Sequence, residues 1–160
     1  MQGAQTAEGE GQVLAITFLV SGSLFGMEAS FVQEVVHLTT ITKVHHAASC
    51  VIGVMNLRGH ISTVIDLSAR LGLGAADLTG GERIIIVEWM GERIGLVVDE
   101  MQDVLALDRE SIRPAPENVR SAQSQRMTGV FGAGTRIVAM LDLEKVLTLD
   151  TDGESGAVVS

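Results

Sequence analysis

An internal repeat constrains the fold of this chain more than any other feature of its sequence. The segment Phe25-Gly26-Met27 matches Ile94-Gly95-Leu96, and the same offset places Val32-Gln33-Glu34-Val35 on Met101-Gln102-Asp103-Val104. Each copy follows a turn, carries a glycine in its returning strand and ends in an apolar-Gln-acid-Val stretch. The same order of features twice is typical of a duplicated unit.

A second pair of segments supports the repeat. Residues His60–Leu67 and Arg136–Leu143 are both apolar strands that end in Asp-Leu before a helix-like stretch. Asp66 and Asp142 take matching positions, where a carboxylate can cap the helix N-terminus. Chance similarity between apolar strands is the alternative, but the matched order favours duplication. Strand units this small leave edges exposed, so we expect them to close into barrels or to pair with one another.

Short β-prone stretches punctuated by glycine dominate the rest of the pattern, which predicts an all-β fold with short helices. Two of the predicted strands flank Arg58, within Gly53–Leu67. The others are Val13–Val20, Leu24–Met27, Phe31–Leu38, Arg83–Met90, Arg93–Asp99, Gln102–Leu107 and Arg136–Leu141. Within Phe31–Leu38, the stretch Gln33–Val36 is also compatible with a helix. Helices are expected at Leu67–Leu71 and Asp142–Leu147. The glycine-rich residues 129–134 are interpreted as a flexible hairpin and 117–125 as a loop. Polar composition predicts disorder in residues 1–11 and in the tail 150–160, flanking one domain at 12–149.

Charge and composition exclude several classes of function. The chain of 160 residues has a formal charge of −9 and no tyrosine. A nucleic-acid backbone or an anionic membrane face needs a basic surface, so neither is an expected partner. No apolar run is long enough to span a bilayer and one cysteine allows no internal disulfide, so we expect a soluble cytoplasmic protein.

No catalytic or metal-binding set stands out, so we expect no enzyme activity, no metal and no cofactor. The sequence has no Gly-x-Ser-x-Gly elbow and no phosphate-binding loop. Asp66 and Asp142 are better explained as equivalent helix caps than as an acid–base pair. His45 and His46 precede Cys50, but adjacent histidines on a strand point to opposite faces and rarely reach one ion.

Arg58 is the candidate functional side chain that the pattern itself presents. It lies in the segment Gly53–Leu67 (GVMNLRGHISTVIDL), at the expected tip of a turn between two buried strands. Gly59 after it permits a positive φ angle. A guanidinium held on a tight turn is suited to forking onto a carboxylate or a carbonyl group. The alternative is a solvated arginine on a hairpin loop.

This segment closely resembles the CheW family of bacterial chemotaxis adaptors. The resemblance runs from about Val13 to Leu147 and includes FGMEASFVQEVV, the hairpin ERIIIVEWMGERIGLVVDEMQDVLAL, SIRPAPE and TGVFGAGTRIVAMLDLEKVL, in the family's order. The chain departs from the family between His45 and Cys50, where a proline near Ala48 and an aromatic residue near Cys50 are usual. This departure is compatible with a looser loop before Gly53 or with a different kinase or receptor as partner.

The resemblance implies two interlocked five-stranded β-barrels that bridge a chemoreceptor cytoplasmic tip, a helical hairpin, to the regulatory domain of the histidine kinase CheA. The protein would then be cytoplasmic and recruited to receptor arrays at the membrane. The positions that match the family's receptor groove are Val32, Glu34, Arg58, Ile61, Gly95, Met101 and Val104. Glycine at 95 would let a receptor helix approach the strand closely. Gly53 is the position assigned to the kinase contact.

Three alternatives to this function remain open at this point. The adaptor could serve a non-flagellar chemosensory pathway, such as surface motility. It could be a CheV-like regulatory module, although no receiver domain follows in the sequence. It could also be a small β-barrel enzyme or ligand carrier, which would need a concave polar site that the sequence does not show.

Overall fold

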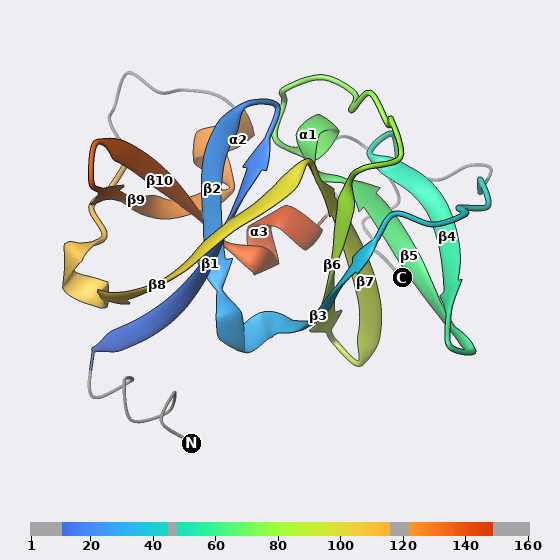
Figure 1. The fold of residues 1–160 in the computed structure, drawn as a ribbon, viewed down its shortest axis with the longest axis horizontal. Coiled ribbons are helices and arrows are strands. Elements are labelled where there is room, and N and C mark those ends of the chain that lie inside the picture. The colour runs from blue at the N-terminus through green and yellow to red at the C-terminus, as the bar shows by residue number, and fades with distance from the viewer. Residues whose placement is uncertain (1–10, 45–47, 116–121, 149–160) are drawn as a thin grey trace.

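Two five-stranded sheets make up the described part of the chain. The computed structural model describes residues 11–44, 48–115 and 122–148. The first sheet has the order β8-β1-β2-β10-β9, with strands β1 Gln12–Val20, β2 Ser23–Glu28, β8 Glu100–Asp108, β9 Met127–Ala133 and β10 Arg136–Leu141. The second has the order β3-β6-β7-β5-β4, with strands β3 Val32–His37, β4 Val51–Leu57, β5 His60–Asp66, β6 Arg83–Trp89 and β7 Glu92–Val98. The predicted all-β class is confirmed (Figure 1).

Within the described ranges, five short helical segments connect or follow these strands. They are the 3₁₀ turns η3 Ala29–Phe31 and η4 Arg109–Ser111 and the helices α1 Leu67–Arg70, α2 Ala122–Gln125 and α3 Leu143–Leu147. The predicted caps are present: an Asp66 side-chain oxygen accepts from the Ala69 N–H at 3.3 Å, and one of Asp142 accepts from the Glu144 N–H at 3.1 Å. Both expected helices are therefore confirmed, with α1 ending one residue early at Arg70.

The two sheets exchange strands, which interlocks them. β3 follows β2 along the chain but pairs with β6 in the other sheet, and β8 follows β7 but pairs with β1. The registers match under the repeat: Val32 lies opposite Val87, Met101 lies opposite Phe18, and a bulge follows at once in each case. Figure 1 shows both strands crossing between the halves of the molecule. The duplication inferred from sequence thus extends to strand pairing.

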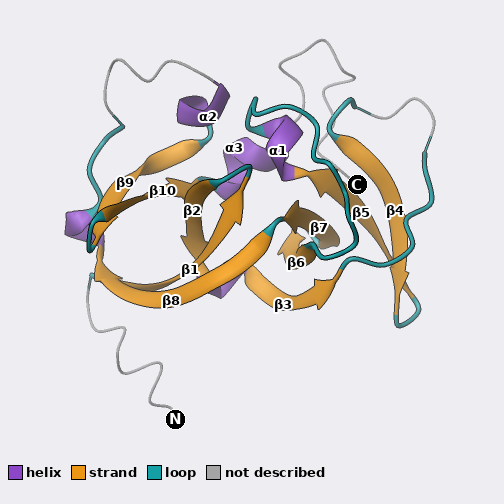
Figure 2. Cartoon of the chain, turned by 45° about the horizontal axis from the view of Figure 1, so that its top comes forward, coloured by secondary structure: helices purple, strands orange, loops and turns teal. Residues whose placement is uncertain are grey.

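A short segment beyond each exchanged strand closes its sheet into a barrel. Thr42 forms an antiparallel bridge with Val54 of β4, with N–H···O distances of 2.8 Å in both directions. Arg113 forms the equivalent bridge with Val130 of β9, at 2.8 and 2.7 Å. In Figure 2 the strands of the first sheet surround one interior. Closure leaves fewer unpaired strand edges.

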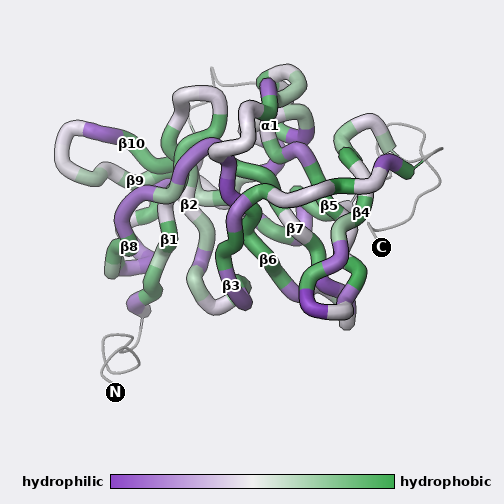
Figure 3. Tube along the Cα trace, turned by 45° about the vertical axis from the view of Figure 1, so that its right-hand side comes forward, coloured by the Kyte–Doolittle hydropathy of each residue, from purple (hydrophilic) through white to green (hydrophobic). Residues whose placement is uncertain are grey.

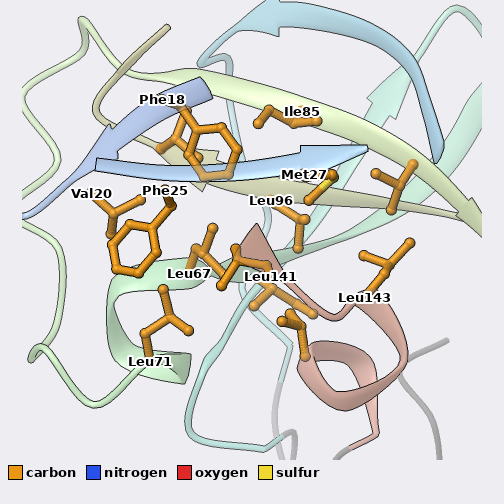
Figure 4. Packing of buried hydrophobic residues seen from close by; sticks show 14 of the residues in the cluster. Phe18, Val20, Phe25, Met27, Leu67, Leu71, Ile85, Leu96, Leu141 and Leu143 are labelled. Carbon is orange, nitrogen blue, oxygen red and sulfur yellow. The ribbon is translucent and has the colours of Figure 1, made fainter. Parts of the chain in front are cut away.

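The buried apolar residues form one central core and two smaller barrel cores. The central core joins both sheets and both flanking helices, as Figure 4 shows for Phe18, Phe25, Ile85, Leu96, Leu67 and Leu143. One barrel interior holds Val13, Ala15, Leu107, Phe131, Val138 and Met140, and the other holds Met55, Val64, Ile84, Ile86 and Val97. Hydrophobic residues accordingly dominate β6 and β7 (Figure 3), which are covered on both faces.

Two predictions about the C-terminal half differ from the structure in part. Residues 129–134 do lie in a hairpin, but 129–133 belong to the strand β9, which pairs with β10, and only Gly134 lies in the turn between them. Residues 122–125, expected in a loop, form the helix α2. The predicted disorder of residues 1–10 and 150–160 lies outside the described residues.

Candidate functional site

The turn between β4 and β5 holds Arg58 as the sequence predicts. Arg58 has φ 52° and Gly59 has φ 85°, the paired positive angles of a two-residue hairpin turn. The side-chain oxygen of Asn56 accepts a hydrogen bond from the Gly59 N–H at 2.9 Å, which fixes the turn from within. Two other hairpin turns, Ser21-Gly22 and Met90-Gly91, use the same pair of angles. The backbone therefore presents Arg58 at a defined position.

An ion pair holds the Arg58 side chain in place. Its guanidinium donates to the carboxylate of Glu34 on β3. Because β3 and β4 are the two edge strands of the second sheet, the ion pair connects one edge strand to the turn that follows the other. The Arg58 side chain is 64% exposed and that of Glu34 28%. An exposed pair of this kind adds only about 0–1 kcal/mol to stability. Its main effect is to orient a guanidinium that still has N–H donors directed to solvent.

Ile61 supplies an apolar surface on the strand that leaves this turn. It is 63% exposed and lies on β5 opposite Asn56. A shallow hollow beside it is lined by His60, Glu88 and Arg93, among other residues of β4–β7. A large exposed isoleucine close to a fixed guanidinium is suited to contact with a partner, because neither side chain has a packing role in the barrel.

The remaining predicted receptor positions divide between the two sheets. Val32 and Met101, the repeat equivalents, are both half-buried and pack against the central core from β3 and β8. Val104 is 60% exposed on β8 and lies opposite Ile16 of β1. The structure thus brings Glu34 and Arg58 into contact and places Ile61 beyond the same turn. Met101 and Val104 belong to the other sheet.

Gly95 has a steric role inside the second barrel, and its expected receptor contact stays a prediction. It is buried on β7 with φ outside the positive range, and a Cβ there would lie 2.6 Å from Cγ2 of Ile84, inside the second barrel. A side chain at this position would therefore enter the barrel core and would not act as a wedge against a docked helix. Gly26, its repeat equivalent, leaves room in the first barrel in the same way, since a Cβ would lie 2.9 Å from the Met140 sulfur.

Gly53 also has a structural explanation. It is buried beneath the segment that closes the second barrel, and a Cβ there would lie 2.1 Å from the backbone oxygen of Thr42. Gly129 of β9 is its counterpart, with a Cβ position 2.4 Å from the Arg113 oxygen. Close approach of two backbones requires glycine at both places. The presence of Gly53 therefore needs no kinase contact to explain it.

Sequence reasoning missed two exposed apolar residues that the repeat itself could have identified. Ile137 is 67% exposed on β10 at the position equivalent to Ile61, and Val35 is exposed on β3 at the position equivalent to Val104. Each barrel therefore carries one outward isoleucine and one outward valine at matching positions. The repeat alignment paired these residues, but their outward direction depends on the bulges and on barrel closure.

The described residues offer no metal centre. No group of three or more His, Cys, Asp or Glu side chains within the described ranges is arranged to hold an ion. Cys50 is buried, and burial raises the pKa of its thiol above the ordinary value. His45 and His46 lie outside the described residues. Among the helices that the structure describes, none is long and apolar enough to cross a membrane.

Comparison with known proteins decides the family. The profile of the CheW-like domain matches residues 14–151, nearly the whole chain. The chain belongs to the CheW family. It is 31% identical over 140 residues to a probable chemotaxis protein CheW of Rhizobium etli, covering 88% of this chain and 90% of the relative. It is 30% identical to the chemotaxis protein CheW of Bacillus subtilis over 143 residues, covering 89% and 90%.

A solved structure of the family has the same fold. The crystal structure of the scaffolding protein TtCheW from Thermoanaerobacter tengcongensis superposes with a TM-score of 0.77 at 31% identity, covering 86% of this chain and 89% of that one. The interlocked barrels are therefore the fold of the CheW family. The relatives are chemotaxis and scaffolding proteins, which agrees with a role in assembly rather than catalysis.

Proposed function

We propose that this protein is a non-catalytic adaptor that couples chemoreceptors to the histidine kinase CheA. Membership of the CheW family supports the general role. The observation that carries the proposal is the turn-borne Arg58, oriented by Glu34 beside the exposed Ile61. This arrangement offers a fixed charge and an apolar side chain to a partner.

The receptor tip is the partner assigned to this surface. A helical hairpin presents apolar side chains along one face and polar groups beside them, and such a helix binds by inserting its apolar face into a complementary surface. Ile61 and Val104 supply exposed apolar area, while Val32 and Met101 supply half-buried area at the central core. The free N–H groups of Arg58 are suited to a carboxylate or a helix-terminal carbonyl of the receptor.

For the kinase contact we propose the partner, the CheA regulatory domain, without assigning residues to it. Gly53 is not assigned to it, because this residue is covered by the closing segment at Thr42. Receptor binding would bring the protein to membrane-associated arrays without any insertion of its own. The same adaptor role applies whether the array controls flagella or another output.

Binding measurements with a matched pair of variants test the receptor surface. Ile61→Ser and Ile137→Ser remove equally exposed isoleucines at equivalent places in the two barrels, so their effects on stability should be alike. A receptor-tip hairpin should bind Ile61→Ser about tenfold more weakly than the unmodified chain, and Ile137→Ser normally. The CheA regulatory domain should bind the unmodified chain in a separate titration. Equal receptor affinity for both variants would contradict the assignment.

A further inference from the structure

Three large apolar side chains that the receptor surface described above does not include lie around the turn between β6 and β7. Met90, the first residue of this turn, is 74% exposed, compared with 63% for Ile61. Trp89, the last residue of β6, is half-buried and packs against the central core. Phe31, the last residue of η3, is 39% exposed. We call Phe31, Trp89 and Met90 the turn patch.

Strand pairing brings the members of the turn patch together. β3 and β6 are antiparallel, with Val32 opposite Val87. Phe31 precedes Val32, and Trp89 and Met90 follow Val87, so all three residues lie at the same end of this strand pair. Figure 1 shows the segment before β3 and the turn between β6 and β7 at the same lower end of the molecule.

The repeat shows that this turn position is used differently in the two barrels. Ser21 is the equivalent of Met90, and the two residues have φ angles of 50° and 52°. In the first barrel, the Ser21 N–H donates to the Asp99 carboxylate at 2.8 Å, and its hydroxyl hydrogen-bonds to Ser68 of α1 at 2.7 Å. A helix of the chain itself thus contacts that turn. In the second barrel the matching position carries a long, adaptable and mostly exposed apolar side chain, which favours contact with a partner.

The turn patch is continuous with the proposed receptor surface on two sides. Trp89 packs against the central core from the strand that pairs with β3, and Val32 and Met101 pack against the same core. On the other side, Gly91 of the turn lines the hollow beside Ile61. A helix that covers either group of receptor positions would therefore extend over the turn patch.

Charged side chains next to the turn select the chemistry of the occupant. Glu88 and Glu92 are exposed on either side of the turn, with Arg93 as the neighbouring cation. The amide of Gln33 on β3 donates to the Glu88 carboxylate at 2.9 Å and so holds this charge beside the patch. We propose that the turn patch binds a helix of the receptor tip, through large apolar side chains flanked by basic ones. This contact rests on the proposed adaptor function and extends its receptor surface.

Titration of Met90→Ser with a receptor-tip hairpin tests the contact. This substitution copies the equivalent turn of the first barrel, where Ser21 has the same positive φ, so the turn should keep its shape. Receptor-tip affinity should fall about five- to tenfold, whereas Ile137→Ser, which removes a similarly exposed side chain from the other barrel, should bind normally. Affinity for the CheA regulatory domain should be unchanged in both variants. Normal receptor affinity of Met90→Ser would overturn this inference, and weakened binding by Ile61→Ser in the same assay would leave the proposed function standing.

Trp89 reports occupancy of the patch directly, because it is the only tryptophan in the chain. A receptor-tip hairpin without tryptophan should shift its emission to shorter wavelength, since a bound helix excludes water from the half-buried indole. A shift caused by the CheA regulatory domain and not by the receptor tip would assign the patch to the kinase and overturn the inference. A shift that depends on the concentration of the chain alone would assign it to a second copy, with the same consequence. Failure of the unmodified chain to bind the receptor tip at all would refute the proposed function and this inference with it.

Discussion

Substitution of Gly95 by alanine tests the barrel interior that β7 helps to form. The added Cβ would lie 2.6 Å from Cγ2 of Ile84 and 3.5 Å from Cδ1 of Ile86, whereas ordinary contacts between such carbons are about 3.5–4.0 Å. Ile84 and Ile86 are both fully buried, so neither side chain can move aside into solvent. We expect the overpacked barrel to lose about 1–3 kcal/mol of its free energy of unfolding.

The assay is urea unfolding followed by circular dichroism, with the thermal midpoint as a second readout. A loss of about 1–3 kcal/mol should lower the midpoint by roughly 2–10 °C, at an unchanged slope on denaturant. Gly132→Ala is the control, because it also lies in a strand but a Cβ there meets nothing within 4 Å. That variant should stay within about 0.5 kcal/mol of the unmodified chain.

A double substitution checks the cause. Ile84→Ala alone should open a cavity in the barrel. In the double variant, the methyl group of Gly95→Ala should partly fill that cavity. The double variant should therefore be more stable than the sum of the two single losses in free energy of unfolding predicts. Gly95→Ala should also weaken receptor and kinase binding in parallel, through lost folded protein. Normal stability of Gly95→Ala with selective loss of receptor binding would refute this reasoning and restore a direct contact at Gly95.

Three further predictions concern the barrels and two buried groups. Gly129→Ala, in the same strand as the neutral Gly132→Ala, should cost about 1–3 kcal/mol because its Cβ would meet the closing segment; urea unfolding of the two variants decides this. The Cys50 thiol, whose pKa burial raises, should react with a disulfide reagent slowly in the folded protein and rapidly after unfolding. Burial alone would raise the pKa of Glu82, but hydrogen bonds from the preceding backbone N–H groups lower it below 4.5. Its contribution to stability should therefore be present above pH 4.5 and be lost as the pH falls through the lowered pKa. Glu82→Gln should lower the thermal midpoint at neutral pH and flatten that acid dependence.

The fold could be predicted from the sequence largely because the repeat carries long-range information. Equivalent segments indicated the matching roles of Asp66 and Asp142, and the strand pattern predicted the pairs joined by short turns, such as β6 with β7. The repeated order of elements also predicted two paired barrels. Local strand propensity alone does not specify such an arrangement. The strand β9 was missed because glycine lowers strand propensity, whereas Gly129 is present to admit a crossing backbone.

The site could be predicted only in part, since side-chain direction depends on tertiary structure. The turn geometry of Arg58 follows from the Arg-Gly pair, but its bond to Glu34 requires β3 to cross into the second barrel. The same crossing brings Met101 of β8 against the central core and leaves Val104 exposed. The inward direction of Gly95 could not be obtained from spacing, as a strand glycine carries no side chain whose polarity reveals its face.

Arg58→Glu is the measurement that tests the adaptor account most directly. The residue is exposed on a turn, so reversal of its charge should change the free energy of unfolding by no more than about 0.5–1 kcal/mol. Receptor-tip affinity should fall at least about tenfold, equivalent to 1.4 kcal/mol, because a carboxylate replaces the presented donor and adds to the charge of Glu34. Affinity for the CheA regulatory domain should be unchanged in the same preparation. Normal binding of the receptor tip by a folded Arg58→Glu protein would contradict the account.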